Sequence, residues 1–189
     1  MTEQTLTGRK ILILASQGVE EVELTSPRDA LTEAGASVTL ASPDGDEFQA
    51  LNGDWDRGQS FQPDSGFDGL SAEQFDGLVL PGGTLNADRV RQDERAQALV
   101  REFLDHSKPV AAICHAPWLL IDSGVAEGRT LTSFASVAPD LKNAGATWLD
   151  EEVVLDDGLI TSRNPGDLDA FNRAIVNAFQ DEDASEPTG

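Results

Sequence analysis

The chain has 189 residues, a length that suits one well-packed domain better than two undersized ones. Its 34 acidic and 13 basic residues give a net charge of −21, which argues against nucleic-acid binding. No apolar run approaches the roughly 18 residues needed to cross a bilayer, and the N-terminus shows no secretion signal, so we expect a soluble, cytoplasmic protein without a membrane partner.

The acidic residues are scattered along the chain, and only three of the 13 basic residues are lysine. Such a composition is typical of proteins from a salt-loaded cytoplasm, where salt screens the self-repulsion, so we interpret the acidity as the adaptation of a halophile. The single cysteine excludes an internal disulfide. Without clustered thiols or a histidine pair at ligand spacing, no metal and no cofactor is expected.

Apolar blocks of two kinds follow one another along the chain. Short β-branched and leucine-rich blocks that end in turn residues predict strands over residues 10–16, 37–42, 76–83, 109–113 and 151–162. Longer patterns between them predict helices over residues 22–35, 87–106, 116–125, 135–145 and 167–179. This alternation implies a three-layer α/β/α sandwich, with helices on both faces of a mostly parallel sheet.

Several turn signals refine these elements. Gly35, Gly124 and Gly145 stand where a helix C-cap is expected. Pro27, inside the first helix, predicts a kink or a restart. The sequence "DDG" at 156–158, between two β-rich runs, indicates a hairpin and hence one antiparallel part of the sheet.

The glycine-rich and acidic region 44–70 has little periodicity, and two interpretations of it stay open. It is either a plain loop or a two-stranded excursion, around 48–51 and 58–61, that packs on a partner subunit. At the ends, we expect disordered tails at 1–8 and 181–189, so that the single domain 1–189 has its core at about 10–180.

Three predicted strands run directly into a tight turn and a helix, where open α/β sheets bind their ligands. In "VAAICHAPW", Cys114 follows a buried strand and precedes a helix N-terminus, which should expose its sulfur and lower the pKa of its thiol. A buried structural cysteine is the plainer alternative. The adjacent His115 argues against it, because an imidazole at a strand end is hard to explain as core packing.

The other two strand ends carry weaker signals. In "LPGG", Gly82 and Gly83 let the backbone turn tightly and bring N–H groups toward a ligand, which makes an oxyanion hole possible. In "GVEEVEL", the acids Glu20, Glu21 and Glu23 fall in the first helical turn, where complementing the helix dipole explains at least two of them. One could instead contact the cysteine sulfur, and helical spacing does not say which.

The chain has only two histidines, and this narrows the mechanism. His106 closes a predicted helix, where a capping role is ordinary. A papain-like enzyme or an α/β-hydrolase needs a base histidine well downstream of its nucleophile, and none exists here. If Cys114 works with a histidine, that histidine is His115.

These residues resemble the PfpI-type members of the ThiJ/PfpI superfamily, the intracellular cysteine peptidases of older usage, over about residues 10–180. The resemblance lies in "EEVEL..P", "FDGLVLPGG", "DRVRQD", "SKPVAAICHAP" and "NAGATWLDEEVVLDDGLITSRNPGDL". It implies a flavodoxin-like fold in which Cys114 is the nucleophile at a strained elbow and Glu23 contacts its sulfur. Backbone N–H groups near Gly83 and His115 would form the oxyanion hole. Asp88 matches the acid that orients the histidine from a neighbouring subunit, so a homo-oligomer, a dimer or a hexamer, would complete the site.

The resemblance also implies that Glu20, Gly82, Ala116 and Phe134 line the pocket. The chain departs from the family pattern at three places: Ala116 replaces the glycine of "CHGP", Phe134 stands where many relatives have tyrosine, and the turn after Gly83 is one residue longer. The longer turn affects how far Asp88 can reach.

The activities of such relatives include peptidase, glyoxalase and deglycase, and all begin with the addition of sulfur to a carbonyl carbon. We expect such an enzyme, acting on a small dicarbonyl or a glycated protein, because no long peptide-binding segment is visible. The alternative is a redox-sensing or chaperone-like stress protein whose Cys114 is oxidised beside Glu23. A binding protein with a vestigial site is a third possibility. The function of His115 separates the first two, since only turnover needs an acid/base imidazole.

Overall fold

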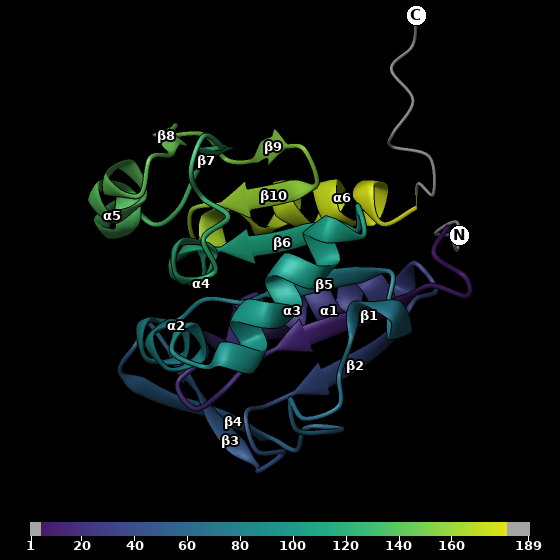
Figure 1. Ribbon diagram of the computed structural model, residues 1–189. Helices are drawn as coiled ribbons and strands as arrows, with labels where there is room; N and C mark the ends of the chain where they lie inside the picture. The colour runs from purple at the N-terminus through teal and green to yellow at the C-terminus, as the bar shows by residue number, and fades with distance from the viewer. Residues whose placement is uncertain (1–4, 181–189) are drawn as a thin grey trace, which may run out of the picture.

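The computed structural model describes residues 5–180, and its centre is a six-stranded sheet (Figure 1). The strand order is β2-β1-β5-β6-β10-β9, and every neighbouring pair is parallel except β9 and β10. The strands are β1 (Lys10–Leu14), β2 (Ser37–Ala41), β5 (Gly77–Leu80), β6 (Val110–Ile113), β9 (Val154–Asp156) and β10 (Leu159–Ser162). The strand order reverses between β1 and β5, and the five parallel strands have the flavodoxin-like order, which confirms the predicted fold class.

Helices cover both faces of this sheet. In Figure 1, α1 and α6 lie behind the sheet, and α3 and α4 lie in front of it. The α-helices of the described chain are α1 (Glu21–Glu33), α2 (Thr84–Arg91), α3 (Glu94–Asp105), α4 (Pro117–Asp122), α5 (Ala138–Asn143) and α6 (Leu168–Ala178). Short 3₁₀ turns lie at Ala72–Gln74, Ala135–Val137 and Pro165–Asp167.

Strand β1 shows why the apolar blocks form buried strands. Successive side chains of a strand point to opposite faces, so Leu12 and Leu14 pack into the core under α3 and α4, whereas Ile11 and Ile13 pack under α1 and α6. All four side chains are buried. A sheet covered on both faces therefore needs an unbroken apolar strand.

The predicted helix over 87–106 is wrong in one respect, because the structure has two helices there. Asp93 lies between α2 and α3 with an extended backbone, and its side chain accepts a hydrogen bond from Arg95 N at 2.9 Å, so it caps α3. Helix α1 continues through Pro27, so the predicted restart is absent. The glycine C-caps are confirmed, with φ of 99° at Gly35, 74° at Gly124 and 89° at Gly145.

Region 44–70 contains an antiparallel hairpin of β3 (Phe48–Asn52) and β4 (Asp56–Phe61), so the two-stranded interpretation is confirmed. The hairpin packs on its own chain: Leu51 N donates to Val19 O at 2.8 Å, and Leu51 bridges to Glu20. Packing on a partner subunit stays a prediction. The short pair β7 (Thr130–Leu131) and β8 (Thr147–Trp148) was not predicted.

Of the expected N-terminal tail, residues 5–8 form a turn that is fixed to the body of the protein. Leu6 is buried, and its N–H donates to Ala34 O at 2.8 Å. Residues 1–4 and 181–189, the rest of the expected tails, lie outside the described residues.

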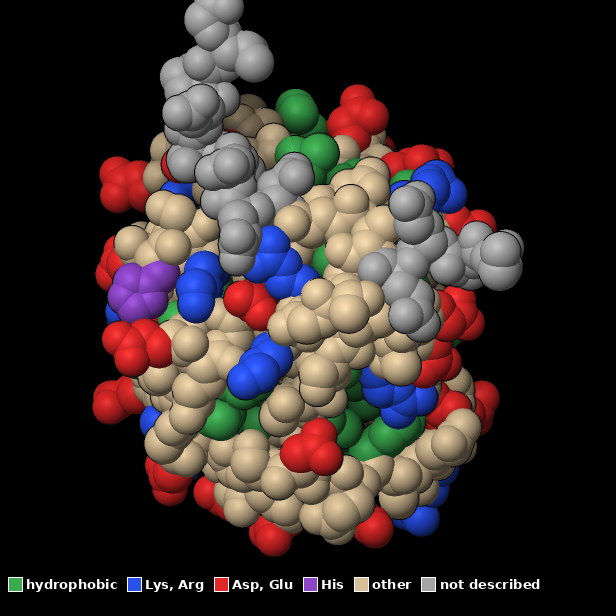
Figure 2. All heavy atoms as spheres, turned by 90° about the vertical axis from the view of Figure 1, so that its right-hand side faces the viewer, with side chains coloured by type: hydrophobic (Ala, Val, Ile, Leu, Met, Phe, Trp, Pro, Cys, Tyr) green, Lys and Arg blue, Asp and Glu red, His purple; other side chains and the backbone are tan. Residues whose placement is uncertain are grey.

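The end of the sheet at which the parallel strands begin faces the viewer in Figure 2, and acidic side chains are scattered around it rather than gathered in one patch. Across residues 5–180 no helix is long and apolar enough to cross a membrane.

Candidate active site

Cys114 follows β6 directly and lies at the carboxyl end of the sheet, beside the point where the strand order reverses. Its φ of 65° is left-handed, a conformation that costs a side-chain-bearing residue about 1–3 kcal/mol. Neighbours hold it there: Cys114 N donates to Ser162 O at 3.1 Å, and Cys114 O accepts from Phe134 N at 2.8 Å. Pro117 then starts α4. The sequence folds into the predicted elbow.

The "LPGG" turn after β5 approaches Cys114 so closely that only glycine fits. A Cβ on Gly82 would lie 2.4 Å from Glu23 Oε2 and 2.7 Å from Cys114 Cβ. Gly83 has a left-handed φ of 86°, and a Cβ there would lie 2.5 Å from Glu20 N. The Gly83 N–H and the His115 N–H both hydrogen-bond the Cys114 sulfur, and both favour its thiolate form. Two amide donors therefore converge on the sulfur.

Glu23, in the first turn of α1, is fully buried against the thiol. Its Oε2 accepts from Gly82 N at 3.0 Å, and its Oε1 meets no nitrogen or oxygen partner within residues 5–180. Burial, with the nearby charge of Glu20, raises the pKa of Glu23 to about 8, although hydrogen bonds from Cys114 and Gly82 oppose the shift. Glu23 is therefore protonated near pH 7 and can donate a hydrogen bond to the sulfur.

The direction of the Cys114 pKa corrects the expectation from the sequence. A helix N-terminus should lower the pKa of a thiol, but α4 has only six residues and Cys114 is only 6% exposed. Burial raises the pKa of Cys114, and the charge that Glu23 carries above its own pKa of about 8 raises it further, whereas the Gly83 and His115 N–H groups offset only part of this. The resting thiol is therefore neutral, and it needs a base to become a nucleophile.

His115 lies beside this thiol. Its Nδ1 lies 3.2 Å from Cys114 Sγ. Burial lowers the pKa of His115, and only the charge of Asp54 opposes this, so the ring is neutral near pH 7 and can accept a proton. Phe134 stacks on the ring at 4.6 Å between centroids, and Trp118 lies against it at 5.2 Å. The imidazole is thus fixed in place beside the sulfur.

Sequence reasoning missed two residues that contact the other ring nitrogen and a third, Asp54, that binds one of them. His115 Nε2 lies 3.2 Å from Ser136 Oγ and 3.5 Å from Thr84 Oγ1. Asp54, at the tip of the β3–β4 hairpin, accepts from both Thr84 Oγ1 at 2.7 Å and Thr84 N at 2.9 Å. The hydroxyl that directly follows "LPGG" was a usable signal for Thr84. Nothing in the sequence pointed to Asp54 or Ser136.

Two predicted site residues, Asp88 and Glu20, make their contacts away from the sulfur. Within residues 5–180, the Asp88 carboxylate contacts Arg91 Nε at 3.1 Å and Gln92 Nε2 at 3.3 Å, on the exposed side of α2. Glu20 accepts from Gly53 N at 2.9 Å, near Glu23 but outside the contacts of the sulfur. The structure therefore brings Glu20 beside the site and leaves Asp88 outside it.

Asn86 is another residue that the sequence analysis did not identify, and it holds the "LPGG" turn in shape. It is buried at 1% exposure. Its Nδ2 donates to the carbonyl oxygens of Pro81 and Gly82 at 2.9 Å each, and its Oδ1 accepts from Ser16 N at 2.7 Å. This side chain ties the end of β1 to the end of β5.

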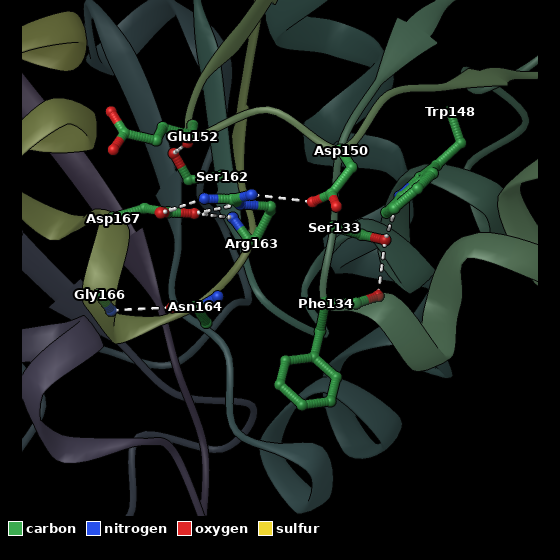
Figure 3. A network of polar contacts seen from close by, with 10 residues as sticks. All are labelled: Ser133, Phe134, Trp148, Asp150, Glu152, Ser162, Arg163, Asn164, Gly166 and Asp167. Atoms are coloured by element: carbon green, nitrogen blue, oxygen red, sulfur yellow. Dashed lines mark hydrogen bonds and ion pairs between the residues drawn. The ribbon is translucent and has the colours of Figure 1, made fainter.

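Figure 3 shows polar contacts that include Phe134, whose ring stacks on His115. Arg163, just after β10, binds both oxygens of the buried Asp167 at 2.9 Å each. In a second group of contacts, Trp148 Nε1 donates to Ser133 Oγ at 3.1 Å, and that hydroxyl donates to Phe134 O at 2.9 Å. Two of the expected pocket residues lie next to His115. Phe134 stacks on its ring, and the buried Ala116 directly follows His115 in the chain.

Comparisons with known proteins agree with this geometry. The DJ-1/PfpI family matches residues 9–178. Deglycase PfpI of Pyrococcus furiosus is 42% identical over 171 residues, which are 90% of this chain and 99% of the relative. Protein/nucleic acid deglycase 2 of Escherichia coli is 42% identical over 171 residues, 89% of this chain and 96% of the relative. The crystal structure of Drosophila melanogaster DJ-1beta matches with a TM-score of 0.83 and 32% identity, over 92% of each chain.

Proposed function

The chain belongs to the DJ-1/PfpI family, and from that premise we propose that it is a PfpI-type enzyme whose Cys114 thiol adds to a reactive carbonyl. The substrate is a small dicarbonyl such as methylglyoxal, or the adduct that such a compound forms on a protein. The names of the two deglycase relatives support this class of substrate.

The observation that carries the proposal is the 3.2 Å distance between Cys114 Sγ and His115 Nδ1. As sulfur attacks the aldehyde carbon, the thiol proton passes to Nδ1, a C–S bond forms, and the carbonyl π electrons move to oxygen. The imidazolium then returns the proton to that oxygen, which completes a hemithioacetal. Because thiol and imidazole both begin neutral, no buried charge has to be maintained before the substrate arrives.

The "LPGG" turn supports the same step. The Gly83 and His115 N–H groups, which contact the sulfur at rest, are placed to stabilise the negative oxygen that the attack creates. Protonated Glu23 supplies a further donor beside the sulfur.

Burial of the thiol favours a small substrate over a peptide. Cys114 is 6% exposed and His115 is 7% exposed. A peptide must place its scissile carbonyl against the sulfur while its chain extends on both sides, whereas a three-carbon dicarbonyl needs only a narrow approach. The peptidase activity implied by the older family name is therefore the weaker candidate.

A redox-sensing or chaperone-like role is the alternative, and the protonated Glu23 supports it, since it could donate to an oxidised sulfur. The raised pKa and burial of Cys114 argue against it, because oxidation favours exposed thiolates. His115→Ala separates the two roles. If the protein is an enzyme, the substitution should remove dicarbonyl turnover. If it is only a sensor, the wild type shows no turnover, and the substitution should leave the peroxide oxidation of Cys114 unchanged.

Several predictions from the sequence stay predictions. They are the single domain 1–189, the cytoplasmic location, the halophilic origin, the stress role and the homo-oligomer in which Asp88 of one copy reaches His115 of another. Sedimentation of the purified protein, followed by assay of each species, tests the last of these.

Methylglyoxal consumption and lactate formation by the purified full-length protein test the proposed function. Cys114→Ala should reduce both to the uncatalysed rate, and Cys114→Ser, which keeps a hydroxyl of similar size, should also be inactive because serine is a far weaker nucleophile here. Consumption by Cys114→Ala at the wild-type rate would exclude the mechanism. Cysteine-dependent cleavage of casein without dicarbonyl consumption would replace the substrate class with peptides.

A further inference from the structure

We propose that Thr84 and Asp54 are positioning residues for His115: the Thr84 hydroxyl donates to Asp54 and accepts from His115 Nε2–H, which leaves His115 Nδ1 free to take the Cys114 proton. This inference deepens the proposed function and rests on it. It assigns the orientation of the imidazole to residues of the same chain.

The direction of the hydrogen bonds follows from what each group can donate. The Asp54 carboxylate accepts from Thr84 N, and the Thr84 hydroxyl donates across the 2.7 Å contact to Asp54 Oδ2. A hydroxyl has one proton, so toward His115 Nε2, at 3.5 Å, Thr84 Oγ1 offers lone pairs. Ser136 Oγ, at 3.2 Å from the same nitrogen, can accept as well. The favoured partner of these oxygens is an Nε2–H.

The tautomer of His115 decides whether it can act as a base. A neutral imidazole has one N–H, so a proton on Nε2 leaves a lone pair on Nδ1, facing Cys114 Sγ at 3.2 Å. The other tautomer would set the Nε2 lone pair against the lone pairs of Thr84 Oγ1 and would point Nδ1–H at the thiol. Only the first can remove the Cys114 proton.

Asp54 is held rigidly enough for this role. Its left-handed φ of 65° at the hairpin tip is supported by the bond from Gly53 N to Glu20 Oε2 at 2.9 Å. The Asp54 carboxylate is fixed a second time by Thr84 N at 2.9 Å. On β4, Gln59 N donates to Glu21 Oε2 at 2.6 Å, so both strands of the hairpin are tied to the start of α1.

This arrangement explains the use of all three acids in "VEEVE". Glu20 and Glu21 bind the hairpin backbone at Gly53 and Gln59, while Glu23 turns inward to the sulfur. The hairpin is therefore docked by the same helical turn that supplies the buried carboxyl of the site.

The tautomer of His115 can be read by long-range ¹H–¹⁵N NMR of the full-length protein at pH 7.5, with His106→Gln to assign the two histidines. Wild type should show the proton on Nε2. Thr84→Val, which keeps the shape and removes the hydroxyl, should raise the fraction with the proton on Nδ1, and Thr84→Ser should restore the wild-type ratio. An unchanged ratio in Thr84→Val overturns the proposal.

Kinetics give the second measurement, with methylglyoxal as the probe. Thr84→Val and Asp54→Asn should each lower kcat about tenfold with little change in KM, since the base stays in place and only its orientation is lost. Thr84→Ser should keep wild-type kcat, and Asp56→Asn, an exposed aspartate on the same hairpin, is the matched control. Wild-type kcat in Asp54→Asn together with a large loss in Asp88→Asn would overturn the proposal in favour of an acid from a second copy. If Cys114→Ala were as active as wild type, the proposed function would fail, while the NMR result would still decide the tautomer.

Discussion

Two buried carboxyl groups on opposite sides of β6 show how differently one fold can treat the same chemistry. Asp167 is 4% exposed and is bound by Arg163, whose hydrogen bonds lower the pKa of Asp167. Glu23 is fully buried without a cation, and burial raises the pKa of Glu23 to about 8. Asp167 is a paired charge that stabilises the fold. Glu23 is a carboxyl that burial keeps protonated near pH 7.

The contrast separates the structural part of the sheet end from the chemical part. Around Arg163 each charge has an opposite partner, including Asp150 at 2.8 Å, and the backbone is fixed by these contacts. At the sulfur itself, Cys114, His115 and Glu23 are neutral near pH 7, and the backbone of Cys114 is strained at a φ of 65°. A buried carboxyl with a raised pKa, such as that of Glu23, is typical of a functional site.

The largest expected effect is on the pH dependence of stability, when Glu23 is replaced by a side chain that does not titrate. The folded pKa of about 8 lies above the ordinary value of 4.5, so the folded state binds one more proton than the unfolded state between these two pH values. The free energy of unfolding of the wild type therefore falls as pH rises from 4.5 to 8, by roughly 5 kcal/mol from this group. Glu23→Gln should remove that slope, because glutamine does not titrate and can still accept from Gly82 N.

Urea unfolding at pH 5 and pH 8.5 measures this effect, with Glu73→Gln as a control at an exposed glutamate. The other carboxylates contribute equally to all three proteins, so only the difference between variants matters. Equal pH slopes in wild type and Glu23→Gln would mean that Glu23 is not held protonated.

Replacing Arg163, the cation that binds Asp167, should lower the free energy of unfolding by a smaller amount, and it should do so throughout the neutral pH range. Arg163→Met leaves Asp167 buried and unpaired, which should lower the free energy of unfolding at pH 7 by about 3 kcal/mol. The loss should shrink as pH falls below the ordinary pKa of aspartate, since a protonated Asp167 needs no partner. Arg173→Met, at an exposed position of α6, is the control in the same urea experiment. A stability equal to that of the control would remove Asp167 from the comparison.

The same contrast explains what the sequence could predict. Short sequence patterns predict the strands, the elbow and the glycine turn. Cys114 follows one buried block and Gly82–Gly83 follow another, so both were expected at the carboxyl ends of neighbouring strands, here β5 and β6. Choosing Glu23 among the acids of α1 needed the family resemblance, because spacing along one helical turn does not fix which side chain faces the sulfur. The "DDG" hairpin was equally local, and the structure has it at β9 and β10.

What could not be predicted depends on contacts between distant segments. Asp54 meets Thr84 across 30 positions, through a hairpin whose existence was itself left open. The pKa of Cys114 moved opposite to expectation because burial and Glu23 outweigh a six-residue helix. The break between α2 and α3 turned on Asp93, whose capping role was hidden inside an otherwise continuous helical pattern.

The smallest expected effect tests whether the hydrogen bonds behind Phe134 help to position the imidazole. Trp148→Phe keeps most of the ring and removes the hydrogen bond from Trp148 Nε1 to Ser133 Oγ, so it should lower the free energy of unfolding by about 1 kcal/mol. Ser133 binds Phe134 O, and Phe134 stacks on His115, so the same change should also lower kcat for methylglyoxal. The decrease should be only about twofold, because Trp118 still contacts the His115 ring. Trp55→Phe, at a tryptophan that is 88% exposed, is the matched control for both measurements. A loss of stability with unchanged kcat would show that this hydrogen bond stabilises the fold without positioning the imidazole.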